Sequence, residues 1–349
     1  MRVVPPHPRI HTGLWVVLGT GALLFSIVLG VCLGPVQIPL AEVWQVITAQ
    51  LLGRETGLPD ATVSIVWHLR VPRVLLGAMV GLSLAVSGVA MQAFTKNVLA
   101  DPYVLGVSSG ASLGAVLAMA STAASGLGAA KVPLAAFTGA VVAILLVYLL
   151  ARTTAEVSPI RLVLVGIAVS ATFTAFTNFT VYSAPDDAKV REATFWMLGG
   201  VAGVEWPALV PLAVVLGPAL VTLFVLGPHL NAMMMGDAAA TTLGVNVNQT
   251  RRVLIVATAL LTGVSVAVSG AIGFVGLVVP HIVRSMVGAD HRRVLPLAAL
   301  GGGTFLVWVD VAARLIDIPK EIPLGILTSM IGAPVFLWMI RTRRYAFGG

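Results

Sequence analysis

Three groups of polar side chains in this 349-residue chain could do chemistry, and the first is a stripe of hydroxyl and amide groups. Its members fall at i, i+4, i+7 and i+8, so on a helix they share one face: Ser170, Thr174, Thr177 and Asn178. Hydroxyls in such a position either bond back to carbonyls of their own helix or line a polar, uncharged path. We take these four residues as candidates for path lining and keep back-bonding as the alternative.

The second group consists of three arginines that we expect at one membrane surface. Arg70 and Arg73 flank Pro72 at the start of an apolar stretch, and Arg314 follows Asp310 by four residues, so those two can pair on one helix face. Such arginines can snorkel, form a structural salt bridge, or clamp carboxylates of a docked protein, because the guanidinium fork fits a carboxylate with two hydrogen bonds. We expect all three to point outward, with Asp310 holding Arg314.

The third group is the polar segment 231–252, which interrupts two apolar halves. Asp237 after Gly236 suits the first turn of a short helix, and Gly244 suits its end. The pair Arg251–Arg252 is expected to form a wet, basic edge. Such a helix could press into another protein, and an ordinary connecting loop is the alternative. The candidate contact residues are Gly236, Asp237, Ala240, Leu243, Gly244 and Val245.

Several kinds of chemistry have no residues to carry them. There is no G-x-x-x-x-G-K-[ST] sequence, so we expect no hydrolysis of nucleotide by a P-loop in this chain. No nucleophile–base arrangement or His/Cys/carboxylate metal cluster is evident, and Met233–Met235 is interpreted as packing. Ion-coupled transporters place ionisable groups near the membrane midplane. The only charges well inside an apolar stretch are Asp310 and Arg314, and both are expected near a surface.

The composition defines an integral membrane protein. Hydrophobic residues make up 58% of the chain and charged residues only 10%, against about 25% charged in soluble domains. Thirty-six glycines favour closely packed helices over a barrel. The net charge of +7 reflects basic residues gathered in cytosolic loops and predicts no nucleic-acid binding. The single cysteine, Cys32, excludes an intrachain disulfide, and we interpret the first apolar stretch as a retained span.

The elements that must position these groups are apolar stretches long enough to cross the membrane. The stretch after residue 252 has no charge up to Val283, so we divide it at Gly270–Gly273 and expect a bend at Pro280. The sequence thus predicts an all-α protein with about ten transmembrane helices, at Leu14–Gly34, Val74–Phe94, Tyr103–Ala120, Val132–Ala151, Leu162–Tyr182, Trp206–Leu226, Val253–Ala271, Ile272–Val287, Val294–Ile316 and Pro323–Ile340.

An even number of spans places both termini on one side of the membrane. If that side is cytosolic, thirteen of the 21 basic residues lie inside, which the positive-inside rule favours. We therefore expect a single transmembrane domain over 1–349, with cytosolic segments at 1–13, 231–252 and 341–349. Glycines four apart, Gly77 with Gly81 and Gly106 with Gly110 and Gly114, are expected at helix contacts.

A series of ordered motifs over about residues 66–340 resembles the FecCD family of permeases. Two positions depart from the family pattern: Val98 stands where proline is usual, and Ala239 stands where an acid is common. The matching motifs are Leu69-Arg70-x-Pro72-Arg73, Ser87-Gly88-x-x-Met91-Gln92, Asn97-x-Leu99-Ala100-x-Pro102-x-x-Leu105-Gly106, Gly236-Asp237 through Leu243-Gly244-Val245, Gly273-Phe274-x-Gly276-Leu277-x-x-Pro280-His281-x-x-Arg284, Asp290-His291-Arg292, Pro323-x-Gly325-Ile326-x-Thr328 and Gly332-x-Pro334-x-Phe336.

The resemblance implies the type II ABC importer permease fold, a homodimer with the translocation path between subunits, and a place in the bacterial inner membrane. It implies two ATPase subunits, which bind ATP and Mg, on the cytosolic side, and a periplasmic or lipid-anchored substrate-binding protein on the other. This chain then has no cofactor and no catalytic residue of its own. By the same resemblance, Arg70, Arg73 and Arg314 receive the binding protein, and Asp237–Val245 contacts the ATPase.

The expected function is inward transport of an iron complex. Ferric siderophore is the first choice because it is the commonest substrate class of the family, and haem and cobalamin stay open. The alternative is a secondary transporter or channel that works without an ATPase, against which the lack of midplane carboxylates argues.

Overall fold

All ten apolar stretches form helices. The computed structural model describes residues 12–121, 125–152, 159–184 and 186–342, and within these ranges it contains helices and loops but no strand. The helices are α1 (Thr12–Cys32), α2 (Leu40–Leu52), α3 (Asp60–Val63), the π-helix η1 (Ser64–Arg70), α4 (Val71–Thr95), the 3₁₀-helix η2 (Pro102–Leu105), α5 (Val107–Ala120), the 3₁₀-helix η3 (Ser125–Ala130), α6 (Lys131–Ala151), α7 (Pro159–Tyr182), α8 (Asp187–Met197), the 3₁₀-helix η4 (Trp206–Ala208), α9 (Leu209–Val225), α10 (Gly227–Met234), α11 (Asp237–Thr242), α12 (Val247–Ser269), α13 (Val275–Val287), α14 (His291–Leu315) and α15 (Leu324–Thr342).

Seven helical stretches among the described residues are long and apolar enough to cross a membrane. The other three expected spans, at α5, α13 and α15, are shorter apolar helices. At 1.5 Å per residue, the 14 residues of α5 and the 13 of α13 extend only about 20 Å, less than the ~30 Å hydrocarbon core. Irregular backbone must therefore complete the path of the chain on either side of them.

The division of the long uncharged stretch is confirmed. Helix α12 ends at Ser269, Gly270 adopts a φ of +64°, and α13 begins at Val275 after Phe274 at +67°. The positive φ angles of Gly270 and Phe274 interrupt the helical hydrogen-bond pattern, so the stretch cannot continue as one helix.

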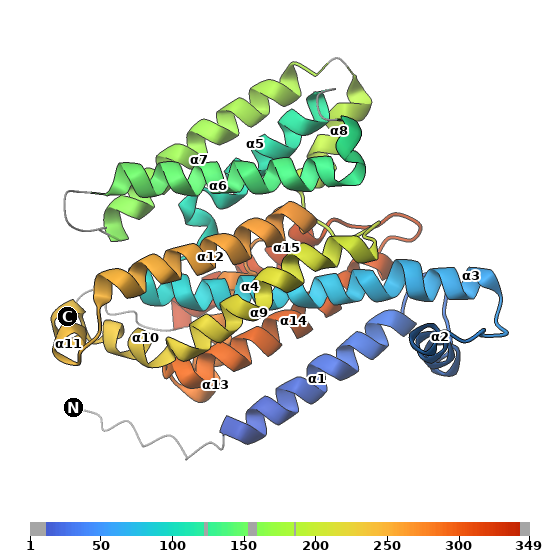
Figure 1. Cartoon of the computed structure of the whole chain (residues 1–349), viewed down its shortest axis with the longest axis horizontal. Helices are drawn as coiled ribbons and strands as arrows, with labels where there is room; N and C mark the ends of the chain where they lie inside the picture. Colours follow the sequence, from blue (N-terminus) through green and yellow to red (C-terminus); the bar gives the residue numbers. More distant parts are fainter. Residues whose placement is uncertain (1–11, 122–124, 153–158, 185, 343–349) are drawn as a thin grey trace.

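The sequence did not predict the elements at one end of the molecule. Helix α2 was not expected, and Figure 1 shows it crossing the direction of the long helices. The second span was expected at Val74–Phe94, but the helix already starts at Asp60 and continues through η1 into α4. A π-helical turn accommodates one extra residue per turn and keeps this stretch continuous.

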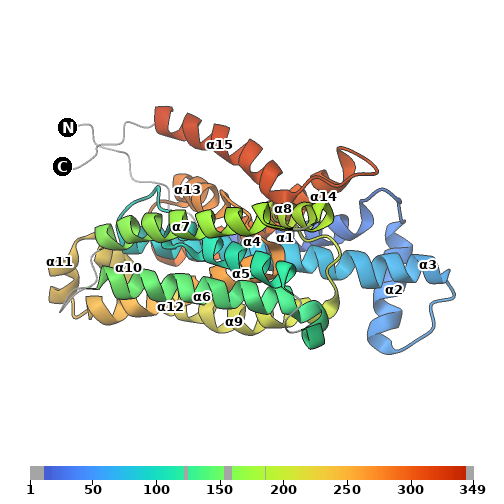
Figure 2. The same ribbon diagram turned by 90° about the horizontal axis from the view of Figure 1, so that it is seen from above.

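The long helices form a bundle with two distinct ends. Figure 2 shows α11 at one end, called here the α11 end, and α2 with α3 at the other, called the α2–α3 end. Helix α4 forms the core of the bundle, since 83% of its most apolar stretch is buried, whereas only 22% is buried in α1 and in α7. Helices that are apolar all round need protein or lipid on every side, so α1 and α7 expose surfaces to lipid or to a partner chain.

One of the close helix contacts joins α4 to α14. A Cβ atom on Gly81 would lie 2.2 Å from the carbonyl oxygen of Gly302, so only glycine permits this approach. Gly110 on α5 likewise lies against Gly139 on α6, which confirms that glycine faces mediate packing here. Gly77 differs from this expectation, because no atom of a neighbouring element lies within 4 Å of the place its Cβ would occupy.

Candidate functional site

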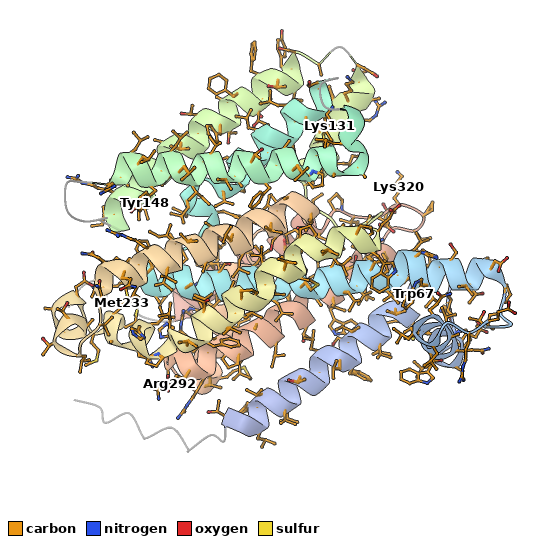
Figure 3. The ribbon with its side chains drawn as sticks, in the orientation of Figure 1. Trp67, Lys131, Tyr148, Met233, Arg292 and Lys320 are labelled. Carbon is orange, nitrogen blue, oxygen red and sulfur yellow. The ribbon has the colours of Figure 1, made fainter. Side chains whose placement is uncertain are left out.

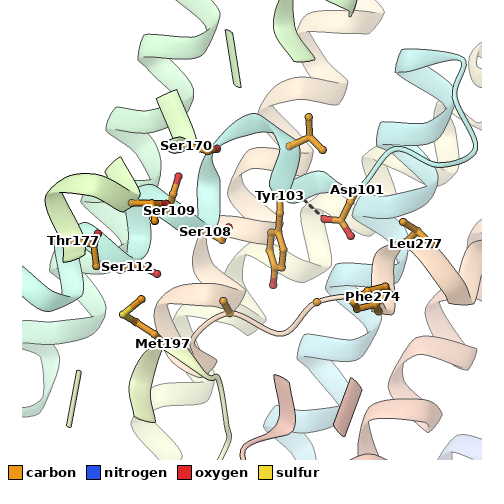
Figure 4. Close-up of a pocket in the computed structure, with 14 residues that line it drawn as sticks. Asp101, Tyr103, Ser108, Ser109, Ser112, Ser170, Thr177, Met197, Phe274 and Leu277 are labelled. Carbon is orange, nitrogen blue, oxygen red and sulfur yellow. Dashed lines mark hydrogen bonds between the residues drawn. The ribbon is translucent and has the colours of Figure 1, made fainter. Parts of the chain in front are cut away.

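A cavity of about 560 Å³ lies where the short helices α5 and α13 leave irregular backbone. Non-helical backbone at membrane depth is tolerated where it is buried in protein or lines a cavity, and this cavity meets that condition. Figure 4 shows its walls, which come from η2, α5, α7 and the 270–274 turn. The lining residues are Asp101, Tyr103, Val104, Ser108, Ser109, Ser112, Ser170, Thr174, Thr177, Met197, Ala271, Gly273, Phe274 and Leu277.

The structure brings three of the four residues predicted for the path to this cavity. Ser170, Thr174 and Thr177 line it, whereas Asn178 is exposed and lies outside the lining. Thr177 Oγ1 also donates a 2.8 Å hydrogen bond to the carbonyl oxygen of Phe173 on its own helix. Lining and back-bonding are therefore not exclusive alternatives, because a hydroxyl that bonds to its helix still presents its oxygen to the cavity.

Sequence reasoning missed the facing wall on α5. Ser108, Ser109 and Ser112 line the cavity opposite α7, and Ser109 Oγ donates to the Gly106 carbonyl oxygen at 3.0 Å. Their spacing of i, i+1 and i+4 in an otherwise apolar helix was the available signal. The sequence did not say which helix α7 would face, so a second stripe had no assigned partner.

Tyr103, which lines the cavity, joins η2 to the 270–274 turn. Its hydroxyl donates to the Ile272 carbonyl oxygen at 2.9 Å and accepts from the Ile272 N–H at 3.1 Å. The Asp101 carboxylate accepts from the Tyr103 N–H at 2.8 Å and so begins η2. The cavity thus has hydroxyl walls and one carboxylate. No group of three or more His, Cys, Asp or Glu side chains able to hold a metal ion occurs among the described residues.

The segment 231–252 contains the short helix that the sequence predicted. Helix α11 starts at Asp237, after Gly236. It ends in a Schellman motif, in which Gly244 N–H donates to Thr241 O at 2.9 Å and Val245 N–H donates to Ala240 O at 3.0 Å. Gly244 has a φ of +82°, which a side chain would strain, so glycine fixes this helix end.

Ion pairs connect α11 to the core helices. Asp237 accepts from Lys96 Nζ at 2.8 Å and from Arg251 Nη2 at 2.6 Å, and these partners belong to the ends of α4 and α12. Partial burial acts to raise the pKa of Asp237, but the hydrogen bonds from Lys96 and Arg251 and their charges outweigh it, so the pKa lies below its ordinary value. Arg251 was expected on a wet edge, but only 5% of it is exposed, and its guanidinium pairs with Asp237.

A second connection joins α10 to α14. Asn231 donates from Nδ2 to Asp290 Oδ1 at 2.7 Å and accepts from the His291 N–H at 2.9 Å. The segment from α10 to the start of α12 is therefore held by three helices of the core: α4, α12 and α14. A displacement of α11 would reach α4 and α12 through the ion pairs of Asp237, and a displacement of α10 would reach α14 through Asn231.

Apolar side chains surround α11 on the outside of this framework. Met235 is 72% exposed and Leu243 is 63% exposed, whereas Ala240 is fully buried beneath them. Large exposed apolar side chains beside paired charges are typical of a protein contact surface. We call Met234, Met235 and Leu243, with α11, the α11 platform.

The structure does not present the three arginines as outward clamps. Arg314 is only 3% exposed, and its guanidinium donates to the carbonyl oxygens of Gly30 at 3.0 Å and Leu33 at 2.9 Å. Arg70 is 6% exposed and donates to the carbonyl oxygens of Val31 at 2.9 Å and Cys32 at 2.8 Å. These carbonyls are at the end of α1, where no helical N–H is available to them. The two positive charges also interact favourably with the negative end of the helix dipole.

Asp310 holds this arrangement together. It pairs with Arg314 at 3.0 Å, as expected from their i, i+4 spacing, and also accepts from Arg73 Nε at 2.8 Å. Arg73 in turn donates to both oxygens of Glu321 at 2.9 Å, and Glu321 is the more exposed member of the group. Arg70 therefore bonds to carbonyls of α1 and Arg73 to carboxylates, although both were expected to point outward. We call Arg70, Arg73, Asp310, Arg314 and Glu321 the arginine network.

A polytopic helical bundle with an internal hydroxyl-lined cavity, and with a short helix joined by ion pairs to two core helices at one end, has the features of a membrane transport subunit. The chain belongs to the FecCD transport family, whose model matches residues 22–342.

Relatives of known name support the same assignment. The chain is 42% identical to the cobalamin import system permease protein BtuC of Halobacterium salinarum over 82% of its own length and 76% of that protein's. It is 40% identical to the hemin transport system permease protein HmuU of Yersinia pestis, over 83% and 86%. It is also 40% identical to the Fe(3+) dicitrate transport system permease protein FecD of Escherichia coli, over 79% and 85%.

A solved structure shares the fold. A metal-chelate type ABC transporter in an inward-facing conformation superimposes with a TM-score of 0.81 at 28% identity, covering 94% of this chain and 99% of the other. The protein is thus the permease subunit of a type II ABC importer and a multi-pass membrane protein.

Proposed function

We propose that this permease moves an iron complex across the inner, cytoplasmic membrane into the cell, with a ferric siderophore as the substrate to test first. The supporting observation is the hydroxyl-lined cavity between α5 and α7. Its volume of about 560 Å³ falls within the ~300–1,000 Å³ of sites for organic ligands. Ser170, Thr174 and Thr177 would line the translocation path, with Asn178 on the exposed face beside them. Hydroxyls bind a large chelate weakly and release it, as a path requires.

The ATPase is proposed to bind at the α11 platform. Two separate ATPase subunits would bind ATP and Mg, and closure of the pair would push on Gly236, Asp237, Ala240, Leu243, Gly244 and Val245. The bonds of Asp237 to Lys96 and Arg251 would carry this displacement to α4 and α12. On this proposal the α11 end is cytosolic, and this chain contributes no catalytic residue.

A substrate-binding protein is proposed to dock at the α2–α3 end. Because Arg70 and Arg314 are occupied by carbonyl oxygens of α1, their part in docking would be to hold that surface in shape. Arg73 with Glu321 is the part of the network closest to solvent and could contact the partner. A homodimer would place the exposed apolar face of α7 against a second copy and enclose the path between the two.

Cobalamin is the second candidate substrate. The observation in its favour is the 42% identity to a permease named for cobalamin, similar to the 40% identity to permeases named for hemin and ferric dicitrate.

Reconstitution tests the function and the substrate together. The permease, its ATPase and its binding protein would be placed in vesicles with ATP on the ATPase side. Uptake of a ferric siderophore, hemin and cobalamin would then be compared using radioactive iron or cobalt. We expect ATP-dependent uptake of the iron complex only when all three components are present. Uptake of cobalamin alone would establish the second candidate. Accumulation by the permease without its partners would refute the proposal in favour of a secondary transporter.

A further inference from the structure

An apolar groove runs between α6 and α12 on the side of the bundle away from the proposed path. Its volume is about 350 Å³, and Figure 2 shows α6 and α12 on the opposite side from α15. The lining residues on each helix follow the i, i+3, i+4 and i+7 pattern of one face, so the groove runs along both helix axes. They are Val141, Ile144, Leu145 and Tyr148 on α6, and Arg252, Ile255, Val256, Ala259 and Leu260 on α12.

The floor of the groove is buried and its rim is open. Ile255 is 6% exposed, whereas Leu145 is 52% and Val256 is 56% exposed. The span from Arg252 to Leu260 is eight residues, or about 12 Å along the helix axis. The groove is therefore long enough for part of one hydrocarbon chain, and its open rim allows a chain to enter from the side.

The polar groups of the groove all lie at one of its ends. Tyr148 is close to the last residue of α6 and lies towards the α11 end (Figure 3). Arg252 is in the second turn of α12, the helix that follows α11 in the chain, so it lies towards the same end. Arg152 follows Tyr148 by one helical turn and is exposed on the same face. Arg252 is exposed too, and no ion pair is recorded for it or for Arg152 among the described residues.

Arg252 and its neighbour Arg251 lie in different electrostatic surroundings. Arg251 is buried and paired with Asp237, but no acidic side chain is among the residues that line the groove. A guanidinium beside a phenol hydroxyl offers donors to a phosphate group at the depth where the apolar lining begins. Lipid tails are as apolar as leucine, so the lining by itself selects nothing, and selection must come from the head group.

We infer that the α6–α12 groove binds an anionic phospholipid in the leaflet at the α11 end. One acyl chain lies along Ile144, Val256 and Leu260, and the phosphate accepts hydrogen bonds from Arg252 and Tyr148. The site adjoins the first turns of α12, which Asp237 connects to the α11 platform, so an occupied groove steadies the helix that receives α11.

Lipid retention by the full-length permease tests this inference. Detergent-purified, delipidated protein would be titrated with phosphatidylglycerol and with phosphatidylcholine of the same chains, and bound lipid counted by native mass spectrometry. We expect the wild type to bind phosphatidylglycerol several-fold more tightly than phosphatidylcholine. Arg252→Gln should remove that preference. Val256→Trp, which fills the open rim and keeps the charge, should reduce binding of both lipids.

Arg292→Gln is the matched control, because Arg292 is an exposed arginine of α14 that does not line the groove. It should keep the lipid preference of the wild type. Equal binding of the two lipids by the wild type, or an unchanged preference in Arg252→Gln, would overturn the inference. Displacement of bound phosphatidylglycerol by inorganic phosphate alone would also overturn it, since the site would then recognise a free anion.

Discussion

Basic side chains gather at both ends of this bundle, but the two ends use them for different purposes. At the α2–α3 end, Arg70 and Arg314 are buried and bonded to backbone carbonyls at the end of α1. At the α11 end, Lys96 and Arg251 pair with Asp237, which is 46% exposed and begins a helix beside exposed apolar side chains. The first arrangement completes the fold, and the second supports a surface.

The difference teaches how to interpret arginine motifs in membrane helices. A guanidinium can satisfy a carboxylate of another protein or a carbonyl of its own chain with the same geometry. Carbonyls at a helix end near the membrane have few alternative donors, so an arginine within reach is drawn to them. An arginine motif at the end of a membrane helix therefore predicts a contact with the chain's own carbonyl groups before it predicts a contact with a partner protein.

Removing Arg314 is expected to have the largest effect. Arg314→Met would leave Asp310 with a single buried partner and the carbonyls of Gly30 and Leu33 without donors. Breaking one side of a buried pair typically costs about 3–5 kcal/mol, so the thermal unfolding midpoint in detergent should fall sharply. Arg54→Met, at an exposed arginine of the same end, is the control and should leave the midpoint unchanged. An unaltered midpoint in Arg314→Met would mean that the arginine network does not hold the fold.

Blocking the cavity is expected to have the next largest effect, on transport alone. Thr174→Trp would project a bulky ring into the cavity and should abolish most ATP-dependent uptake in vesicles while leaving the unfolding midpoint near that of the wild type. Thr172→Trp is the matched control, because Thr172 is exposed on the same helix and does not line the cavity. If both variants transport equally well, the cavity is not the path.

A smaller effect is expected from the end of α11. Gly244→Ala places a side chain at a φ of +82° and should cost about 1–2 kcal/mol locally, which loosens the α11 platform. We expect reduced uptake and ATP hydrolysis that no longer depends on the binding protein. Gly217→Ala, at a helical glycine whose Cβ would meet open space, should retain both properties. Normal coupling in Gly244→Ala would show that the motif at this helix end is not needed.

The smallest expected effect is a pH dependence at Asp237. Its pKa in the folded protein lies below the ordinary value, so the ion pairs stabilise the fold above the unfolded pKa of about 4, and this stabilisation is lost as pH falls through the depressed pKa. The unfolding midpoint of Asp237→Asn should therefore lie slightly below the wild type at pH 7 and meet it at low pH. A constant difference across the range would assign the stabilisation to something other than charge. The half-exposed carboxylate keeps the effect small.

Much of the fold could be predicted because its signals are local. Apolar length identified all ten spans, and the short α11 helix was predicted from one aspartate and one glycine. The residues Ser170, Thr174 and Thr177 were predicted to share a face and do line a cavity. The opposite wall on α5, the continuation of the second span back to Asp60 and helix α2 were not predicted, because each depends on which helices meet.

The sequence by itself determined the membrane class, the helical spans, the family and the shared face of Ser170, Thr174 and Thr177, because composition and helical periodicity are properties of each segment alone. Only the tertiary structure decided what the charged residues do. Whether Arg314 meets a partner's carboxylate or the carbonyl oxygen of Gly30 depends on where the end of α1 lies, 284 residues earlier in the chain. Distances between side chains that are remote in sequence are set by helix packing, and no local pattern records them.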